Sequence, residues 1–192
     1  MDSSLTAGTG RDTESRSELY RLIAKLDGHF RNLGTPSEGE SPAVPSWAGV
    51  LFRLRRSRLL APLDQVMEVL EPPAEITSIP GTRAWVVGVA NNRGTLLPIF
   101  DLAALVYGGT AAPRASDRIL VARQESVPCG LLVNEAIGIR HFELASRLAD
   151  PPPGLGVLAP FAVSAFPLDG EPIAVLALDR LLADPLLQVT EL

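Results

Sequence analysis

The chain has 192 residues, of which 46% are hydrophobic and only 5% aromatic, so its core must be built mainly from Leu, Val, Ile and Ala. A net charge of -5 argues against the basic face that grips nucleic acid phosphates. No apolar run approaches the roughly 18 residues that span a bilayer, and the polar N-terminus lacks a signal-peptide core, so we expect a cytoplasmic protein without direct membrane insertion.

The first 46 residues divide into three predicted segments. Residues 1–14 have no hydrophobic period and are predicted to be disordered. An amphipathic helix is predicted over residues 15–34, because apolar residues recur there at helical spacing after a capping-box pair of Ser15 and Glu18. Residues 35–46 contain prolines and glycines without an apolar rhythm, which predicts a linker.

Residues 47–187 consist of short apolar runs broken by Pro, Gly, Asn and Asp, a texture typical of an all-β barrel or sandwich. Several runs are apolar on both faces, which is expected where two sheets or barrels press together. The predicted strands are 49–54, 58–62, 66–70, 85–90, 96–100, 118–123, 130–133, 161–166 and 173–178. A group of four arginines, Arg53, Arg55, Arg56 and Arg58, is interpreted as a solvated hairpin tip.

Two patterns occur twice in this region. A strand, an Asx residue, a turn and a second strand surround Asp64 and again Asn134. An apolar strand followed by Asp and a short helix occurs at Asp101 and again at Asp179, where the carboxylate is predicted to cap the exposed amides of the helix. The repetition indicates either two related β modules or only the general similarity of strand-to-helix junctions.

The chain offers few groups for catalysis or metal binding. His29 and His141 have no second histidine, cysteine or paired carboxylate at ligand spacing, so no metal site is predicted. Cys129, the single cysteine, lies in an apolar stretch and is expected to be a buried structural thiol. Because neither a P-loop nor a dinucleotide fingerprint is present, we expect no cofactor and no enzymatic activity.

A hairpin is predicted over residues 85–102, where apolar strands flank a polar turn. Gly88 would let a neighbouring backbone approach closely. The residues predicted to tolerate the positive φ of the turn are Asn91, Asn92 and Gly94. Arg93 then stands at the tip, where its guanidinium could hold a partner's carboxylate or carbonyl groups. The alternative is a turn arginine that only keeps the hairpin soluble.

These residues carry a resemblance to a known family. The string Gly-Val-Ala-Asn-Asn-Arg-Gly at 88–94, followed by Leu-Pro-Ile-Phe-Asp-Leu at 97–102, resembles the signature of CheW-like domains. Segments 66–69 and 130–137 are similar to two further parts of that family, and the resemblance covers about residues 47–184. It implies a mostly β fold of two small SH3-like β-barrels packed around a shared core, here preceded by the predicted helix, and no catalysis. The sequence looks more like the PilI-type adaptors of twitching-motility systems than like flagellar CheW, which remains the alternative.

The resemblance also implies partners and a site. The partners would be the cytoplasmic tip of methyl-accepting chemoreceptors and the regulatory domain of a CheA-type histidine kinase, through which the chain would join receptor arrays. The implied receptor- and kinase-binding residues are Val66, Glu68, Asn92, Arg93 and Gly94. Three positions depart from the family pattern and bear on partner choice: Val87, Asn92 and Asn134. A small β-barrel that binds a ligand or nucleic acid is a different alternative, but it predicts exposed aromatics and a basic face that the composition does not offer.

Overall fold

The computed structural model describes residues 44–109, 113–124 and 127–188. The predicted disordered segment and helix, and the predicted linker up to residue 43, lie outside these residues. The strands are β1 (Ser46–Leu54), β2 (Ser57–Pro62), β3 (Val66–Leu70), β4 (Val86–Asn92), β5 (Thr95–Asp101), β6 (Arg118–Gln124), β7 (Val127–Val133), β8 (Glu135–Glu143), β9 (Ala162–Leu168) and β10 (Glu171–Leu176). The helices are α2 (Leu102–Tyr107), α3 (Leu178–Ala183) and α4 (Pro185–Gln188), with 3-10 turns η1 (Leu63–Gln65), η2 (Leu144–Ser146) and η3 (Gly156–Phe161).

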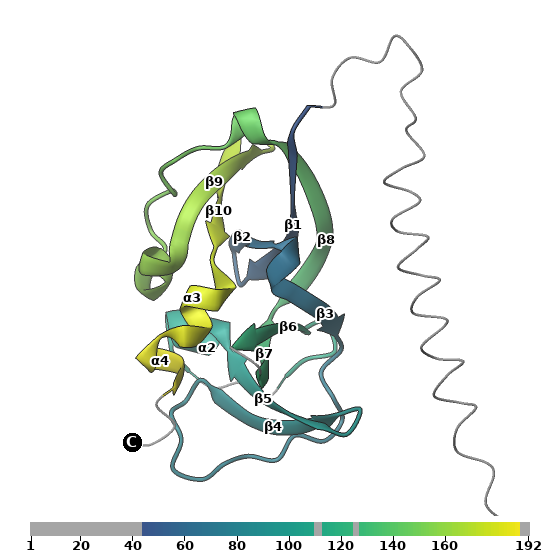
Figure 1. Ribbon diagram of the computed structural model, residues 1–192. Helices are drawn as coiled ribbons and strands as arrows, with labels where there is room; N and C mark the ends of the chain where they lie inside the picture. The colour runs from purple at the N-terminus through teal and green to yellow at the C-terminus, as the bar shows by residue number, and fades with distance from the viewer. Residues whose placement is uncertain (1–43, 110–112, 125–126, 189–192) are drawn as a thin grey trace, which may run out of the picture. The chain divides into compact units, whose positions relative to one another are not determined.

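The strands form two five-stranded sheets that share one topology (Figure 1). The first sheet has the order β8-β1-β2-β10-β9, and the second has the order β3-β6-β7-β5-β4. Each sheet therefore combines two strands from one half of the chain with three strands from the other half. Two pairs that join the halves, β2 with β10 and β5 with β7, are parallel. All other neighbours are antiparallel, including the joining pairs β1 with β8 and β3 with β6. The predicted mostly β fold of two packed modules is confirmed, and the duplicated sequence pattern corresponds to this repeated topology.

The main core lies between the two sheets. In strand β1, the side chains of Val50, Phe52 and Leu54 pack in this shared core, while Leu51 packs in a smaller core of the first sheet. Strand β6 does the same in the second sheet, because Leu120 faces the shared core and its neighbours face a core of their own. Both faces of these central strands are thus buried, which explains why their sequences are apolar without alternation.

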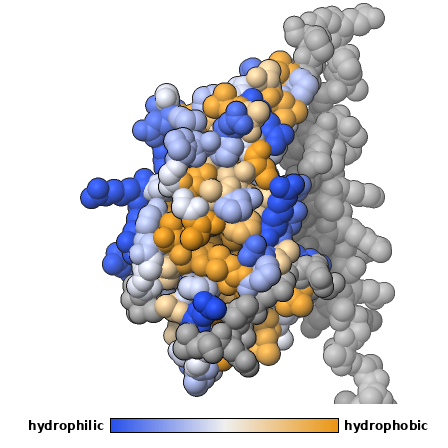
Figure 2. Space-filling view, turned by 90° about the vertical axis from the view of Figure 1, so that its left-hand side faces the viewer, coloured by the Kyte–Doolittle hydropathy of each residue, from blue (hydrophilic) through white to orange (hydrophobic). Residues whose placement is uncertain are grey.

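Short helices and a turn cover the shared core on one side. Helices α3 and α4 and the turn η3 lie over it on the left of Figure 1, and they contribute buried side chains such as Leu158, Leu181 and Leu187. Figure 2 shows this face, where apolar side chains gather at the centre between hydrophilic groups. Half-buried Leu155 and Leu186 pack against the core at its margin.

Strand β8 corresponds to the second strand of the pattern around Asn134, but it is longer than that pattern and is missing from the list of predicted strands. It is an edge strand that pairs only with β1 among the described strands, and its residues alternate irregularly between half-buried and exposed. A bulge in the β1–β8 register and Gly138 at φ 140° interrupt the alternation further. A strand of this kind lacks the continuous apolar run by which the central strands were recognised.

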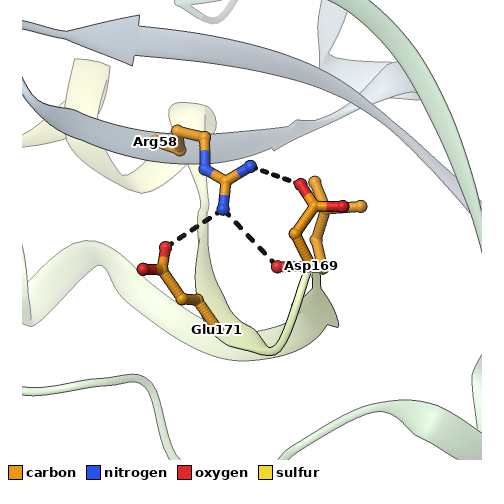
Figure 3. Close-up of polar contacts among 4 residues, drawn as sticks. Arg58, Asp169 and Glu171 are labelled. Atoms are coloured by element: carbon orange, nitrogen blue, oxygen red, sulfur yellow. Dashed lines mark hydrogen bonds and ion pairs between the residues drawn. The ribbon is translucent and has the colours of Figure 1, made fainter.

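The arginine group at the β1–β2 hairpin is only partly the solvated tip predicted from sequence. Arg58 leaves the start of β2 and binds the β9–β10 hairpin, as Figure 3 shows. Its guanidinium contacts the Asp169 carboxylate at 2.7 Å and the Glu171 carboxylate at 3.0 Å. The hydrogen bond to Asp169 is the main cause that raises the pKa of Arg58 above its ordinary value, and the bond to Glu171 adds to it. Arg58 therefore links two hairpins of the first sheet.

Candidate functional site

The tip of the β4–β5 hairpin presents Arg93. Arg93 has φ 51° and Gly94 has φ 85°, so the two central turn residues are both left-handed, as a type I′ turn requires. The prediction that Asn91 and Asn92 take the positive φ is wrong, because both belong to β4. Asn91 instead accepts a hydrogen bond from the backbone N–H of Gly94, at 2.7 Å, and so closes the turn from the side.

The backbone conformation of Arg93 carries a conformational cost. For most residues with a Cβ, the left-handed region costs roughly 1–2 kcal/mol of conformational free energy, whereas Gly, Asn and Asp occupy it more readily. The Arg93 side chain is nonetheless 77% exposed, so this cost is not offset by burial of the arginine. Burial of the side chain therefore does not explain the left-handed backbone at Arg93.

Glu68 joins the hairpin tip to the opposite edge of the second sheet. Its carboxylate accepts a hydrogen bond from the Asn92 amide at 2.7 Å and forms an ion pair with Arg93 at 3.5 Å. Glu68 belongs to β3 and Asn92 to β4, and these are the two edge strands in the order β3-β6-β7-β5-β4. The sheet must therefore curl until its edges meet, which agrees with a small barrel.

The cluster of Glu68, Asn92, Arg93 and Gly94, which we call the hairpin-tip site, contains four of the five predicted site residues. Val66 lies elsewhere: it pairs with Ala122 of β6 and packs half-buried against the shared core. Its environment is that of a core residue at the start of β3. Asn91 is the contact that sequence reasoning missed, although an Asn three residues before a glycine is itself a signal for this side-chain turn.

Two features fix the hairpin to the body of the protein. At Gly88, with φ 143°, a Cβ would collide with the carbonyl oxygen of Thr77, whose backbone pairs with Val89. The predicted close backbone approach at Gly88 is therefore confirmed. At the other end, Asp101 accepts hydrogen bonds from the N–H groups of Ala103 and Ala104, at 2.8 and 3.0 Å, and caps α2 as predicted.

The corresponding prediction for Asp179 is wrong. The side chain of Gln65, in η1, accepts hydrogen bonds from the N–H groups of Leu178 and Asp179 at 2.7 and 3.4 Å and so caps α3. Asp179 lies inside the first turn, where its carboxylate accepts a bond from the N–H of Arg180. A residue from the first half of the chain thus completes a helix of the second half.

The described residues contain no group of three or more His, Cys, Asp or Glu side chains that could hold a metal ion. Cys129 is buried, as predicted, and this burial raises the pKa of its thiol. What the hairpin-tip site offers is an exposed guanidinium beside a half-buried carboxylate, an arrangement suited to binding another protein.

Comparison with known proteins extends this picture. A family model described as "CheW-like domain" matches residues 48–186. The chain belongs to the CheW-like domain family. Protein PilI of Pseudomonas aeruginosa is 36% identical over 147 residues, which cover 77% of this chain and 82% of PilI. Protein FrzA of Myxococcus xanthus is 32% identical over 111 residues, covering 58% of this chain and 68% of FrzA.

A solved CheW-like protein shares the fold. The crystal structure of the scaffolding protein TtCheW from Thermoanaerobacter tengcongensis matches with a TM-score of 0.64 at 22% identity, over 77% of this chain and 95% of TtCheW. The CheW-like family consists of scaffold and adaptor proteins of chemosensory systems, and the predicted resemblance to PilI-type adaptors is confirmed by the sequence match. No helix among the described residues is long and apolar enough to cross a membrane.

Proposed function

We propose that this protein is a non-enzymatic adaptor that couples methyl-accepting chemoreceptors to a CheA-type histidine kinase in a pilus-linked chemosensory system. It would act in the cytoplasm, associated with membrane-bound receptors through its partners. The observation that carries the proposal is the hairpin-tip site, in which Arg93 is held exposed at a costly left-handed position and oriented by Glu68.

The geometry of the site supports protein binding. Glu68 accepts a hydrogen bond from Asn92 and is only 29% exposed, so its carboxylate is fixed before any partner arrives. Arg93, at 3.5 Å from that carboxylate, keeps most of its donors available. A guanidinium oriented in advance loses less side-chain entropy when it binds, which favours affinity. The pilus-linked assignment is supported by the similarity to PilI.

The proposal is tested by measuring binding of the full chain to the regulatory domain of the CheA-type kinase and, separately, to a receptor's cytoplasmic fragment, by isothermal titration calorimetry. Arg93→Ala is expected to weaken binding to at least one partner by about 1–3 kcal/mol, the range for an interface hot spot. Arg147→Ala removes another exposed arginine outside the site and serves as the matched control.

A second measurement tests coupling itself. Kinase autophosphorylation is followed with receptor and adaptor together, and it should respond to wild-type adaptor and to Arg147→Ala more strongly than to Arg93→Ala. If wild-type protein binds neither partner, the proposed function is wrong. If wild-type protein and Arg93→Ala bind both partners equally, the adaptor function stands but the hairpin-tip site is not its contact.

A further inference from the structure

A cleft of about 750 Å³ lies where the two sheets meet. Its first wall is the β1–β2 hairpin, its second wall is the start of β6 with the loop before it, and the beginning of β8 closes it. Five arginines line these walls: Arg53, Arg55, Arg56, Arg114 and Arg118. The chain as a whole has 17 basic residues and a net charge of -5, so this cleft is a local concentration of positive charge on an acidic protein.

Two of these arginines already have acidic partners. Arg53 forms an ion pair with Glu135 at 3.0 Å, and Arg118 forms one with Glu71 at 3.6 Å. Asp117 is the other acidic residue of the lining. Its carboxylate accepts a hydrogen bond from the backbone N–H of Arg114 at 2.7 Å, so it stabilises the loop before β6 and forms no ion pair with the described arginines of the cleft.

The remaining arginines, Arg55, Arg56 and Arg114, are exposed, and none has an ion pair to a carboxylate in the part of the chain that the structure describes. They stand on two walls of one cleft. Among the described residues, three arginines without an acidic partner therefore line one space, which is large enough for a ligand of several groups.

Arg55 is held in place before a ligand binds. Its backbone is left-handed, with φ 52°, and its N–H donates to the Asn134 side chain at 2.7 Å. Its guanidinium donates to the carbonyl of Gly108 at 3.2 Å and lies over the Tyr107 ring, 4.7 Å from the ring centroid. As at Arg93, an arginine occupies a costly turn position, and here neighbouring groups also orient its side chain.

We infer that this cleft binds an acidic peptide segment of a protein partner, through carboxylates that pair with Arg55, Arg56 and Arg114. Guanidinium groups match carboxylates in a bidentate geometry, and arginines on two walls suit carboxylates spaced along a peptide. The Tyr107 ring already carries the Arg55 guanidinium, which leaves little of the ring for a nucleotide base. None of the three arginines belongs to the hairpin-tip site, so the two surfaces can be tested separately.

The test is fluorescence polarisation with a labelled hexaglutamate peptide and the full chain, with hexaglutamine as the neutral comparison. We expect saturable binding of hexaglutamate only, weakened by added salt because the contacts are between exposed charges. Arg56→Glu with Arg114→Glu should weaken it by about tenfold or more, since both cations are reversed. Arg147→Glu with Arg180→Glu changes the net charge equally at two exposed arginines outside the cleft and should bind nearly as wild type.

Further arms separate the possible explanations. Arg93→Ala should bind hexaglutamate as wild type does, so a failure of the proposed adaptor function would leave this result unaffected. Equal loss in both charge-reversed double variants would show general electrostatic attraction and overturn the site. Competition by inorganic tripolyphosphate at lower concentration than unlabelled hexaglutamate would assign the cleft to phosphate and overturn the peptide. Absence of wild-type binding would overturn the inference outright.

Discussion

Replacing Arg93 by asparagine should stabilise the fold and weaken partner binding at the same time. Arg93 and Gly94 are the two central residues of a type I′ turn, with φ 51° and 85°. Asn-Gly is the pair that this turn favours, because asparagine tolerates the left-handed region at lower cost. Relief of the backbone cost is worth about 1 kcal/mol.

The ion pair that the substitution removes is weak. It spans 3.5 Å between a 77% exposed arginine and Glu68, so its loss costs only about 0.2–0.5 kcal/mol. Glu68 keeps its hydrogen bond to Asn92, at 2.7 Å, and is not left without a partner. The net gain should be about 0.5 kcal/mol, which corresponds to a rise in Tm of about 1–2 °C for a domain of this size.

The assay compares Arg93→Asn with Arg93→Ala by urea and thermal unfolding, together with binding to the kinase regulatory domain. Alanine removes the same ion pair but keeps a Cβ in the left-handed region without the tolerance of asparagine. The two variants should therefore lose binding alike, while only Arg93→Asn becomes more stable than wild type. An asparagine variant less stable than the alanine variant would refute the reasoning about strain, and one with wild-type binding would refute the role of the side chain.

Three further outcomes follow from other contacts. Gly88→Ala should lower the free energy of unfolding by about 2 kcal/mol or more, measured by urea denaturation, because φ 143° and the Thr77 carbonyl both exclude a Cβ; a loss below about 0.5 kcal/mol would contradict this. Gln65→Ala should cost about 1 kcal/mol through loss of the α3 cap, whereas Gln65→Glu keeps the acceptor and most of the stability. Cys129 should react with a thiol reagent far more slowly in the native than in the urea-unfolded protein, because burial raises its pKa and blocks access. Equal reaction rates in the two states would show that the thiol is accessible. Because the pKa of Cys129 is raised in the folded protein, its contribution to stability is fully present below the ordinary thiol pKa and declines as the pH rises above that value.

The sequence predicted those elements that local patterns specify. The central strands were recognisable because burial on both faces makes them continuously apolar, and Asp101 was recognisable as a cap because it stands next to the helix that it caps. The edge strand β8 was predicted only as the second strand of the pattern around Asn134, and its full length was missed because it is half-exposed and interrupted by Gly138. Local signals also pointed to the asparagines for the left-handed turn positions, although the register of the hairpin gives one of these positions to Arg93.

What the sequence could not predict depends on contacts between distant residues. Gln65 caps a helix that begins more than a hundred residues later, and no local pattern distinguishes this from a cap by Asp179. The contact of Glu68 with Asn92 requires the two edge strands of a curled sheet to meet. The cleft arginines appeared as a solvated hairpin tip because Arg114, on the facing wall, is remote in sequence. These are tertiary arrangements, and only the topology brings them together.

The exchange of strands between the two halves makes each sheet depend on the whole chain. The first sheet needs β1 and β2 together with β8, β9 and β10, and the second needs β3, β4 and β5 together with β6 and β7. A fragment ending at Gly109 would contain β1 to β5 but neither complete sheet, and it would leave the shared core without Leu120, Leu131 and Leu176. We therefore expect this fragment to show no cooperative unfolding by calorimetry, whereas the full chain unfolds in one transition. A cooperatively folded fragment would mean that the two halves of the chain can fold separately. If the fragment does not fold, one shared core holds the hairpin-tip site and the arginine-lined cleft at a fixed distance. An adaptor that sets the geometry between its partners requires such a fixed distance.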